Sequence, residues 1–387
     1  MKRILIDGTY YQSGTSYHGG GEYGDVILSG LLECNDAEFG IVFHKNAKLH
    51  KMIEKCKAAG WELYPVESFS EVPNIIKENN YKTFYSPLPY EDGRSGVKLP
   101  EGTWFIGTFH GVRPVELLDY LGIRNGSMYG LAIDEVLDEA KRPFIDALTI
   151  SDRRIIITDS QHSKYSLLEH FPFLGKEQIE VLYPPLKNTK EILADERSLL
   201  EYCNVNKNMY SLMVSGGIWY KNATIAAIAY DRVFDNEYSF IDAGYKVVIT
   251  GVDKAMANEV VYDHVRNKDR FVVQPYLPED YLEILYKNAH TFMYPSLDEG
   301  FGYPPLEAMK YGTICACAAS SSIVEICGDM CIYFNPVMIG EIYNRILQSF
   351  SEDIRLDKKD KMSRLSQINE RQKADLNRLI EIILQDR

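Results

Sequence analysis

The sequence has 387 residues, of which 45% are hydrophobic and 25% charged, with a formal net charge of −13. A chain of this length usually forms two domains rather than one hydrophobic core. The negative charge argues against a general nucleic-acid surface, which needs clustered lysine and arginine. Because the sequence shows neither a signal-peptide core nor a membrane-spanning stretch, we expect a cytoplasmic protein.

The cysteines indicate thiols rather than a metal site. Seven cysteines fit a reducing compartment. Zinc sites favour closely paired cysteines or histidines at helical spacing, and the sequence has neither pattern. We therefore expect buried free thiols.

Short apolar runs alternate with longer helix-like stretches along the whole chain. This alternation predicts parallel sheets covered by helices on both faces. The first series of expected strands covers 4–6, 40–43, 103–109 and 155–158, and the second covers 211–215, 246–250, 271–273, 291–294 and 314–316. Helical periodicity covers 22–32, 49–59 and 131–148.

The two series are separated by a break in the pattern. Pro184 and Pro185 end a strand, and the stretch from Lys187 to Asn208 is polar. We place the boundary near residue 190, which predicts an N-terminal domain of residues 1–190 and a C-terminal domain of residues 191–366. Apolar positions within residues 367–387 predict a terminal helix.

The segment Pro295–Thr313 combines a turn that suits phosphate with two spaced carboxylates. A helix is expected to begin near Pro304, and its amino-terminal end favours anions. Gly300 and Gly302 allow close approach of a ligand, with N–H groups on either side of Phe301.

Glu299 and Glu307 are separated by seven residues across this turn. A carboxylate beside a phosphate would be repelled, so each is expected to accept hydrogen bonds from sugar hydroxyls. The alternative is that both are solvated surface acids.

This segment resembles the Glu-x7-Glu signature of retaining GT-B glycosyltransferases of family 4, the group 1 transferases. The similarity continues forward through 314–325, Gly328-Asp329 and 333–336, and backward over 275–289. The resemblance implies an α/β fold of two facing, doubly wound Rossmann-like domains with a cleft between them. It also implies that the terminal helix packs on the acceptor-side N-terminal domain, while residues 191–366 bind a nucleotide-sugar donor.

The same resemblance assigns roles within the signature segment. Glu307 would bind the nucleotide ribose. Glu299, together with the backbone of Gly300, Phe301 and Gly302, would hold the transferred sugar and the diphosphate.

The stretch Ser215–Asn222 resembles the glycine-rich turn of the family that ends in Lys-Asn. By this resemblance Gly217 and Lys221 would contact the donor diphosphate, and Tyr276 and Leu277 would lie beside the base. The family usually adds an arginine in this turn, whereas this sequence has none between Ser215 and Asn222.

The sequence has no Asp-x-Asp pair of the kind that binds a metal diphosphate elsewhere. We therefore expect neither a metal nor another cofactor. Lys221, the backbone amides of Gly300 and Gly302 and a helix dipole would stabilise the leaving diphosphate.

The run from His18 to Gly24 lies between the first expected strand and a helix. The resemblance suggests that Gly20 and Gly21 approach the donor phosphates or the acceptor, and the alternative is a flexible surface loop. A dinucleotide fingerprint can be fitted to this run, but the sequence lacks the supporting acid after a second strand, so a dehydrogenase is disfavoured.

His110 follows an apolar strand, as the histidine of the Thr-x-His-Asp motif does in the family. It would contact the sugar near the reacting carbon, although Gly111 stands where the family has aspartate. A structural histidine is the alternative. The turn from Thr158 to Lys164 also resembles a family turn, with a helix N-cap as the competing interpretation.

Together these features predict a retaining, metal-independent transferase with Glu299, His110 and Lys221 as catalytic residues. It would move a hexose-type sugar from a nucleotide diphosphate-sugar to a glycan or lipid-linked acceptor, in bacterial surface polysaccharide or glycoconjugate synthesis. Peripheral contact with the inner face of the membrane stays open, and the sequence does not indicate an oligomeric state.

Two other functions fit the same fold. The missing arginine and Gly111 motivate a catalytically idle partner that binds glycan or stabilises an active transferase. A nucleotide-sugar epimerase or hydrolase is the third possibility.

Overall fold

The chain is described from a computed structural model. The structure describes residues 2–12, 19–46, 49–90, 93–118, 133–186, 194–236, 238, 241–351 and 358–385. It divides into two compact units: unit 1 is Met1–Asn188 with Glu370–Arg387, and unit 2 is Thr189–Asn369. The expected boundary near residue 190 lies outside the described residues.

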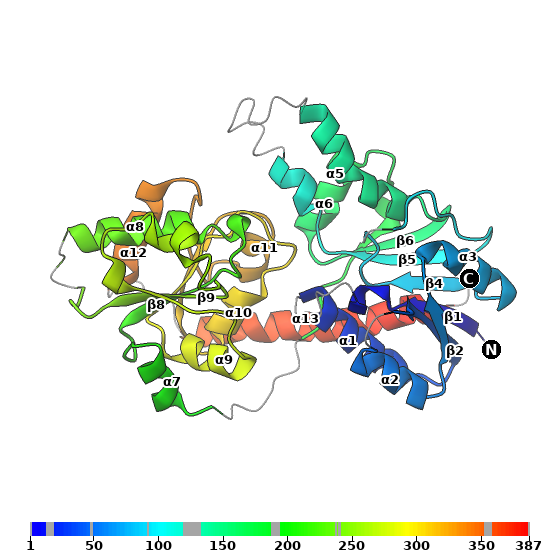
Figure 1. Cartoon of the computed structure of the whole chain (residues 1–387), viewed down its shortest axis with the longest axis horizontal. Coiled ribbons are helices and arrows are strands. Elements are labelled where there is room, and N and C mark those ends of the chain that lie inside the picture. The colour runs from blue at the N-terminus through cyan, green and yellow to red at the C-terminus, as the bar shows by residue number, and fades with distance from the viewer. Residues whose placement is uncertain are drawn as a thin grey trace. The chain divides into compact units, whose positions relative to one another are not determined.

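Unit 1 is built on a seven-stranded parallel sheet with the order β3-β2-β1-β4-β5-β6-β7 (Figure 1). Its strands are β1 (Lys2–Asp7), β2 (Ala37–His44), β3 (Glu62–Val66), β4 (Thr83–Ser86), β5 (Trp104–Phe109), β6 (Arg153–Thr158) and β7 (Ile179–Val181). Its helices include α1 (Gly19–Leu32), α2 (Lys51–Ala58), α3 (Val72–Glu78), α5 (Ile133–Leu148), α6 (Gln161–His170) and the last part of α13 (Lys358–Leu384).

The two faces of this sheet are covered by different helices, as alternation of side chains along a strand requires. On one face Ile4 and Ile6 of β1 share a core with Ile27 of α1, Ile53 of α2 and Ile383 of α13. The opposite face is packed by α3, α5 and α6 around a second buried cluster. Both faces are therefore apolar, which explains the nearly continuous apolar strands of the sequence.

Unit 2 repeats the arrangement with six parallel strands in the order β10-β9-β8-β11-β12-β13. The strands are β8 (Tyr210–Val214), β9 (Lys246–Thr250), β10 (Phe271–Val273), β11 (Thr291–Tyr294), β12 (Ile314–Ala318) and β13 (Ile332–Phe334). The helices include α7 (Glu196–Tyr202), α8 (Ala223–Asp235), α9 (Glu279–Asn288), α10 (Tyr303–Met309), α11 (Ile323–Cys327) and α12 (Ile339–Ser349). In Figure 1, α8 and α12 cover one face of this sheet and α7 and α9 the other.

The strand orders confirm the prediction of two doubly wound, Rossmann-like sheets. In each sheet the order reverses beside the first strand, between β1 and β4 in unit 1 and between β8 and β11 in unit 2. Ligands of such sheets bind beyond the carboxyl ends of the strands at this switch point. The loops that follow β8 and β11 are therefore where the fold favours a ligand in unit 2.

The terminal helix is longer than expected. It begins at Lys358 rather than near residue 367. The ammonium of Lys361 donates to the carbonyls of Gly312 and Thr313, and the Arg364 guanidinium donates to those of Glu325 and Ile326. Polar contacts rather than an apolar stripe hold this first part, so hydrophobic periodicity did not reveal it. Of the helices in the described part of the chain, none has the length and apolar character of a membrane span.

Candidate functional site

The loop after β8 supplies the basic side chain of the candidate site in unit 2. Gly216 and Gly217 have φ angles of +63° and +67°, which favour glycine. A β-carbon on Gly251, after the neighbouring strand β9, would lie 2.7 Å from the amide nitrogen of Gly216, so the two backbones can approach only because Gly251 has no side chain. A single helical turn, Trp219–Lys221, follows and presents Lys221.

Lys221 is joined directly to Glu299, which lies in the loop after β11. The Lys221 Nζ donates to Glu299 Oε1 at 2.6 Å. The hydroxyl of Tyr294 donates to the same oxygen at 2.6 Å, and Lys221 Nζ lies 3.3 Å from that hydroxyl. Glu299 and Tyr294 are buried. The structure thus brings together two predicted catalytic residues and adds Tyr294, which the sequence analysis missed.

This three-residue cluster is an ion pair held by a phenol. Removing one member of a buried ion pair typically costs about 3–5 kcal/mol, because the other charge is left unpaired. A diphosphate near Lys221 would offer it a second anionic partner, and the Glu299 carboxylate could then accept hydrogen bonds from hydroxyl groups. The pair is therefore suited to exchange partners when an anionic ligand binds.

The loop that carries Glu299 ends at Gly302, which has a φ of +99° and precedes α10. The helix begins at Tyr303, next to the predicted start at Pro304, and is seven residues long. Phe301 is buried and its ring contacts that of Tyr303 at 5.0 Å between centroids. Gly312 closes the turn after the helix with a φ of +79°.

Glu307 and the predicted base contacts lie in the same unit. Glu307 Oε2 accepts a hydrogen bond from the Tyr286 hydroxyl at 3.0 Å. Burial, followed by the charge of Glu307, raises the pKa of that phenol well above its usual value. In the loop after β10, Tyr276 is exposed and Leu277 buried, so of these two only the tyrosine side chain is accessible to a ligand.

In unit 1, His110 follows β5 and is held at both ring nitrogens. Nδ1 lies 2.7 Å from Asp159 Oδ2, and Nε2 lies 3.0 Å from the carbonyl oxygen of Pro87. The edge of Tyr23 also contacts the imidazole, with centroids 4.7 Å apart. Three different segments of unit 1 therefore fix the orientation of His110.

These contacts favour the doubly protonated ring. A carbonyl oxygen only accepts, so Nε2 must carry a proton, and an ionised carboxylate needs a proton on Nδ1 as well. Burial lowers the pKa of His110, but the charge and hydrogen bond of Asp159 and the carbonyl of Pro87 outweigh burial, and the pKa is raised. This arrangement favours the protonated form of His110, with both ring nitrogens donating to protein acceptors.

Asp159 could have been found from strand pairing. Phe109 of β5 pairs with Thr158 of β6 in the sheet. His110 and Asp159 directly follow these two residues, and the parallel register places them side by side. The carboxylate that contacts His110 therefore comes from the adjacent strand, whereas position 111, where the family has aspartate, is glycine.

Gly20 and Gly21 differ from the expectation of a loop. Helix α1 begins at Gly19, so both glycines lie in its first turn. The first amides of a helix lack partners within it, and glycine at the start of a helix costs less than in its interior. His18 lies outside the described residues.

The turn after β6 is a helix cap. The Ser160 side chain accepts a hydrogen bond from the Ser163 amide at 3.1 Å. This confirms the N-cap interpretation of the Thr158–Lys164 segment. Lys164 donates to the carbonyl of Ile179, which ties α6 to β7.

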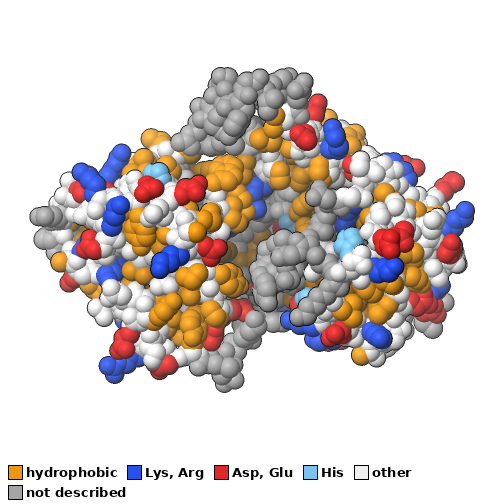
Figure 2. All heavy atoms as spheres, in the orientation of Figure 1, with side chains coloured by type: hydrophobic (Ala, Val, Ile, Leu, Met, Phe, Trp, Pro, Cys, Tyr) orange, Lys and Arg blue, Asp and Glu red, His pale blue; other side chains and the backbone are white. Residues whose placement is uncertain are grey.

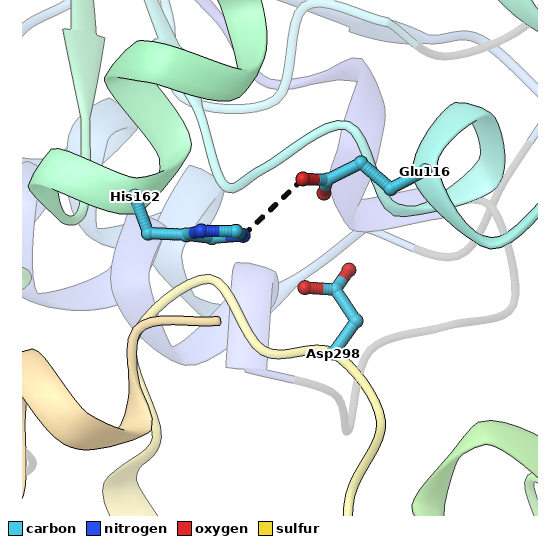
Figure 3. A group of neighbouring side chains, drawn as sticks. All are labelled: Glu116, His162 and Asp298. Atoms are coloured by element: carbon cyan, nitrogen blue, oxygen red, sulfur yellow. Dashed lines mark ion pairs between the residues drawn. The ribbon is translucent and has the colours of Figure 1, made fainter. Parts of the chain in front are cut away.

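A second histidine–carboxylate pair in unit 1 was not predicted. The His162 Nε2 of α6 lies 3.2 Å from Glu116 Oε1 (Figure 3). The Ser166 hydroxyl also donates to this carboxylate. Burial raises the pKa of Glu116, but the hydrogen bonds from His162 and Ser166 and the charge of His162 lower it by more. The pKa of Glu116 is therefore below its usual value. Asp298, the third side chain of the figure, belongs to unit 2.

The surface charges and the cysteines say less about function than the two histidine and lysine pairs do. In the view of Figure 2, lysine and arginine are interspersed with aspartate and glutamate over both units. All seven cysteines are free; six are buried and Cys34 is half-buried. The expectation of free thiols is confirmed.

Comparison with known proteins finds a family match over the part of the chain that carries this site. Residues 204–359 match the family described as glycosyl transferases group 1. The chain is 42% identical over 78 residues to the O-antigen chain mannosyltransferase B of Escherichia coli, a segment that covers 20% of each chain. It is 25% identical over 203 residues to the O-antigen chain mannosyltransferase RfbU of Salmonella typhimurium, covering 52% of this chain and 53% of that one. The matches thus span about half or less of these relatives.

Solved structures resemble the whole chain in fold. A glycosyltransferase from Rickettsia africae is 14% identical with a TM-score of 0.67, and the match covers 100% of this chain and 99% of the other. WaaG, a glycosyltransferase involved in lipopolysaccharide biosynthesis, is 11% identical with a TM-score of 0.61, covering 98% and 99%. At these identities the similarity establishes the GT-B fold.

Proposed function

We propose that this chain, whose residues 204–359 match the group 1 glycosyl transferases, is a glycosyltransferase that uses a nucleoside diphosphate-sugar as donor. The observation that carries the proposal is the Lys221–Tyr294–Glu299 cluster. It joins the loops after β8 and β11, at the switch point of unit 2, where a doubly wound sheet binds ligands. The cluster offers one cation for phosphate and one carboxylate for sugar hydroxyls.

The donor sugar we propose is mannose, and the acceptor a growing surface polysaccharide or a lipid-linked glycan. The two bacterial relatives are named as mannosyltransferases of the O-antigen chain, which supports both choices. Glu307, anchored by Tyr286, would take the ribose, and the exposed ring of Tyr276 the base.

In the proposed mechanism the donor diphosphate draws Lys221 away from Glu299. The ammonium then stabilises negative charge on the leaving diphosphate, while Glu299 and Tyr294 orient the sugar. We propose that neither step needs a metal and that the anomeric configuration is retained. His110 would act through its fixed positive charge.

The test is nucleotide release from a panel of donors, including GDP-mannose, UDP-glucose and UDP-galactose, each with and without a lipid-linked saccharide acceptor. We expect acceptor-dependent release from a nucleoside diphosphate-mannose and an α-linked product from an α-linked donor, as judged by NMR. Release without acceptor would indicate a hydrolase, and isomerised donor an epimerase. A wild-type chain that releases nucleotide from no donor would support the idle-partner alternative.

A further inference from the structure

Three consecutive serines hold the loop that carries Glu299. Ser320, Ser321 and Ser322 form the turn between β12 and α11. The Ser320 hydroxyl donates to the Ser296 carbonyl at 2.8 Å. The Ser321 hydroxyl accepts from the Glu299 amide at 2.9 Å.

Ser322 makes the most direct contact with this loop. Its hydroxyl lies 2.8 Å from the Glu299 carbonyl oxygen and 2.9 Å from that of Phe301, and the residue is fully buried. It also occupies the N-cap position of α11, yet it makes no capping hydrogen bond there. Serine at this position usually caps the helix. Here its hydroxyl serves the neighbouring loop instead.

These bonds determine which way the loop amides face. The described peptide bonds are trans, and in a trans peptide the C=O and N–H of one plane point in opposite directions. Because the carbonyls of Glu299 and Phe301 point to Ser322, the N–H groups of Gly300 and Gly302 point away from it. The Glu299 N–H points toward Ser321 instead.

Ser321 is held in a backbone conformation that costs energy. Its φ is +46°, in the left-handed region, where a residue with a β-carbon loses roughly 1–2 kcal/mol relative to glycine. Glycine would adopt this turn without strain but would offer no hydroxyl to the Glu299 amide. Ser321 thus combines a strained backbone with a side chain that holds the loop of the candidate site.

We propose that Ser320, Ser321 and Ser322 are positioning residues for transfer, with Ser321 and Ser322 the principal pair. They fix the backbone from Glu299 to Gly302 so that the carboxylate is aimed at the donor sugar and the amides of Gly300 and Gly302 at the diphosphate. The proposal rests on the proposed function of this loop.

The experiment compares four variants of the full chain: Ser322→Ala, Ser321→Ala, Ser321→Gly and the control Ser349→Ala. Ser349 is a matched control because its buried hydroxyl also donates to a backbone carbonyl, that of Ile346 at 2.7 Å, but within α12. For each variant kcat, the donor KM, the dissociation constant of the product nucleoside diphosphate and the Tm are measured.

We expect Ser322→Ala to lower kcat by roughly 30-fold, since displacement of a catalytic group by about 1 Å can cost ~100-fold. Ser321→Ala and Ser321→Gly should lose about the same factor in kcat, although the glycine variant should have the higher Tm. Affinity for the nucleoside diphosphate should change less than threefold in each. Ser349→Ala should keep wild-type kcat despite a Tm loss similar to that of Ser322→Ala.

If Ser322→Ala and Ser321→Gly keep kcat within twofold of Ser349→Ala in an active enzyme, the serine proposal is wrong and the proposed function stands. A drop in kcat that follows Tm across all four variants, the control included, would also overturn it. A wild-type chain without turnover on the donor panel would instead remove the proposed function, and this proposal with it.

Discussion

Each unit of the molecule places a cation against a carboxylate beyond the carboxyl ends of its strands. In unit 2 the pair is Lys221 and Glu299, 2.6 Å apart. In unit 1 it is His110 and Asp159, 2.7 Å apart. The lysine pair joins loops on either side of the switch point, whereas the histidine pair lies at the ends of the neighbouring strands β5 and β6, away from the switch point between β1 and β4.

The two pairs differ in how easily the cation can exchange its carboxylate for a ligand. Lys221 is a flexible ammonium that can turn from Glu299 to a phosphate without losing its charge. His110 has both ring nitrogens bound to protein acceptors, and its charge depends on pH. The first pair is suited to open for a ligand and the second to stay closed.

The largest effect is expected from the unit 2 pair. Glu299→Gln and Lys221→Ala should each lower the transfer rate by about 10²–10³-fold, because each removes a charge that the transition state needs. The measurement is the single-turnover rate with saturating donor. Lys287→Ala is the control, since Lys287 and Glu196 form an exposed pair with the same 2.6 Å separation. Unchanged turnover in both site variants would overturn the assignment.

Breaking the unit 1 pair should have a smaller effect on rate and a clear effect on stability. Asp159→Asn should lower the transfer rate roughly 10-fold through misplacement of His110. It should also reduce the free energy of unfolding by about 3 kcal/mol, because the half-buried His110 is left without its counter-charge. Urea unfolding and steady-state rates on the same preparation would check both. A stable Asp159→Asn protein would show that His110 does not depend on this carboxylate.

The histidine pair also predicts a pH dependence with a definite sign. The folded pKa of His110 is raised above 6.5, so the stability it contributes is complete below about pH 6.5 and is lost as pH rises through the folded pKa. His290 provides the opposite case, because burial lowers its pKa and its contribution is lost as pH falls.

Urea unfolding of wild type, His110→Asn and His290→Asn between pH 5 and 9 would measure these contributions. The difference between wild type and His110→Asn should shrink toward high pH, and the difference for His290→Asn should shrink toward low pH. Equal slopes for the two variants would contradict the protonated state of His110.

The smallest effect is expected from metal removal. If Lys221 and the loop amides carry the diphosphate, treatment with EDTA should change the transfer rate less than twofold. Activity that the chelator abolishes and a divalent cation restores would show that a metal supplies part of the charge.

The sequence predicted the fold better than it predicted contacts between loops. The expected strands at 246–250, 271–273 and 291–294 match β9, β10 and β11 residue for residue, because strands buried on both faces are continuous apolar runs. The strands β3, β4 and β13 were missed, and β7 was indicated only by the two prolines that follow it. β3 begins with Glu62 and contains Pro65, which hide its apolar character. β7 and β13 have three residues each, too few to show a period.

The site residues also divide into those marked by local sequence patterns and those that depend on tertiary contacts. The spacing of Glu299 and Glu307 and the position of Lys221 after a glycine-rich turn are local patterns, and sequence could suggest them. Asp159 contacts His110 because β5 and β6 are neighbours in the sheet. Tyr294 bonds to Glu299 within one segment, but its contact with Lys221 depends on the pairing of β11 with β8. Pairings of this kind need the tertiary structure.

Helix α13 has a consequence for the order in which the chain folds during synthesis. Leu379, Ile382 and Ile383 are buried in the core of unit 1, beside strand residues from the start of the sequence. Unit 2 ends at Asn369, so all of its residues leave the ribosome before these three. Unit 1 is therefore synthesised first but completed last. One face of its sheet lacks part of its helical cover until unit 2 has been synthesised.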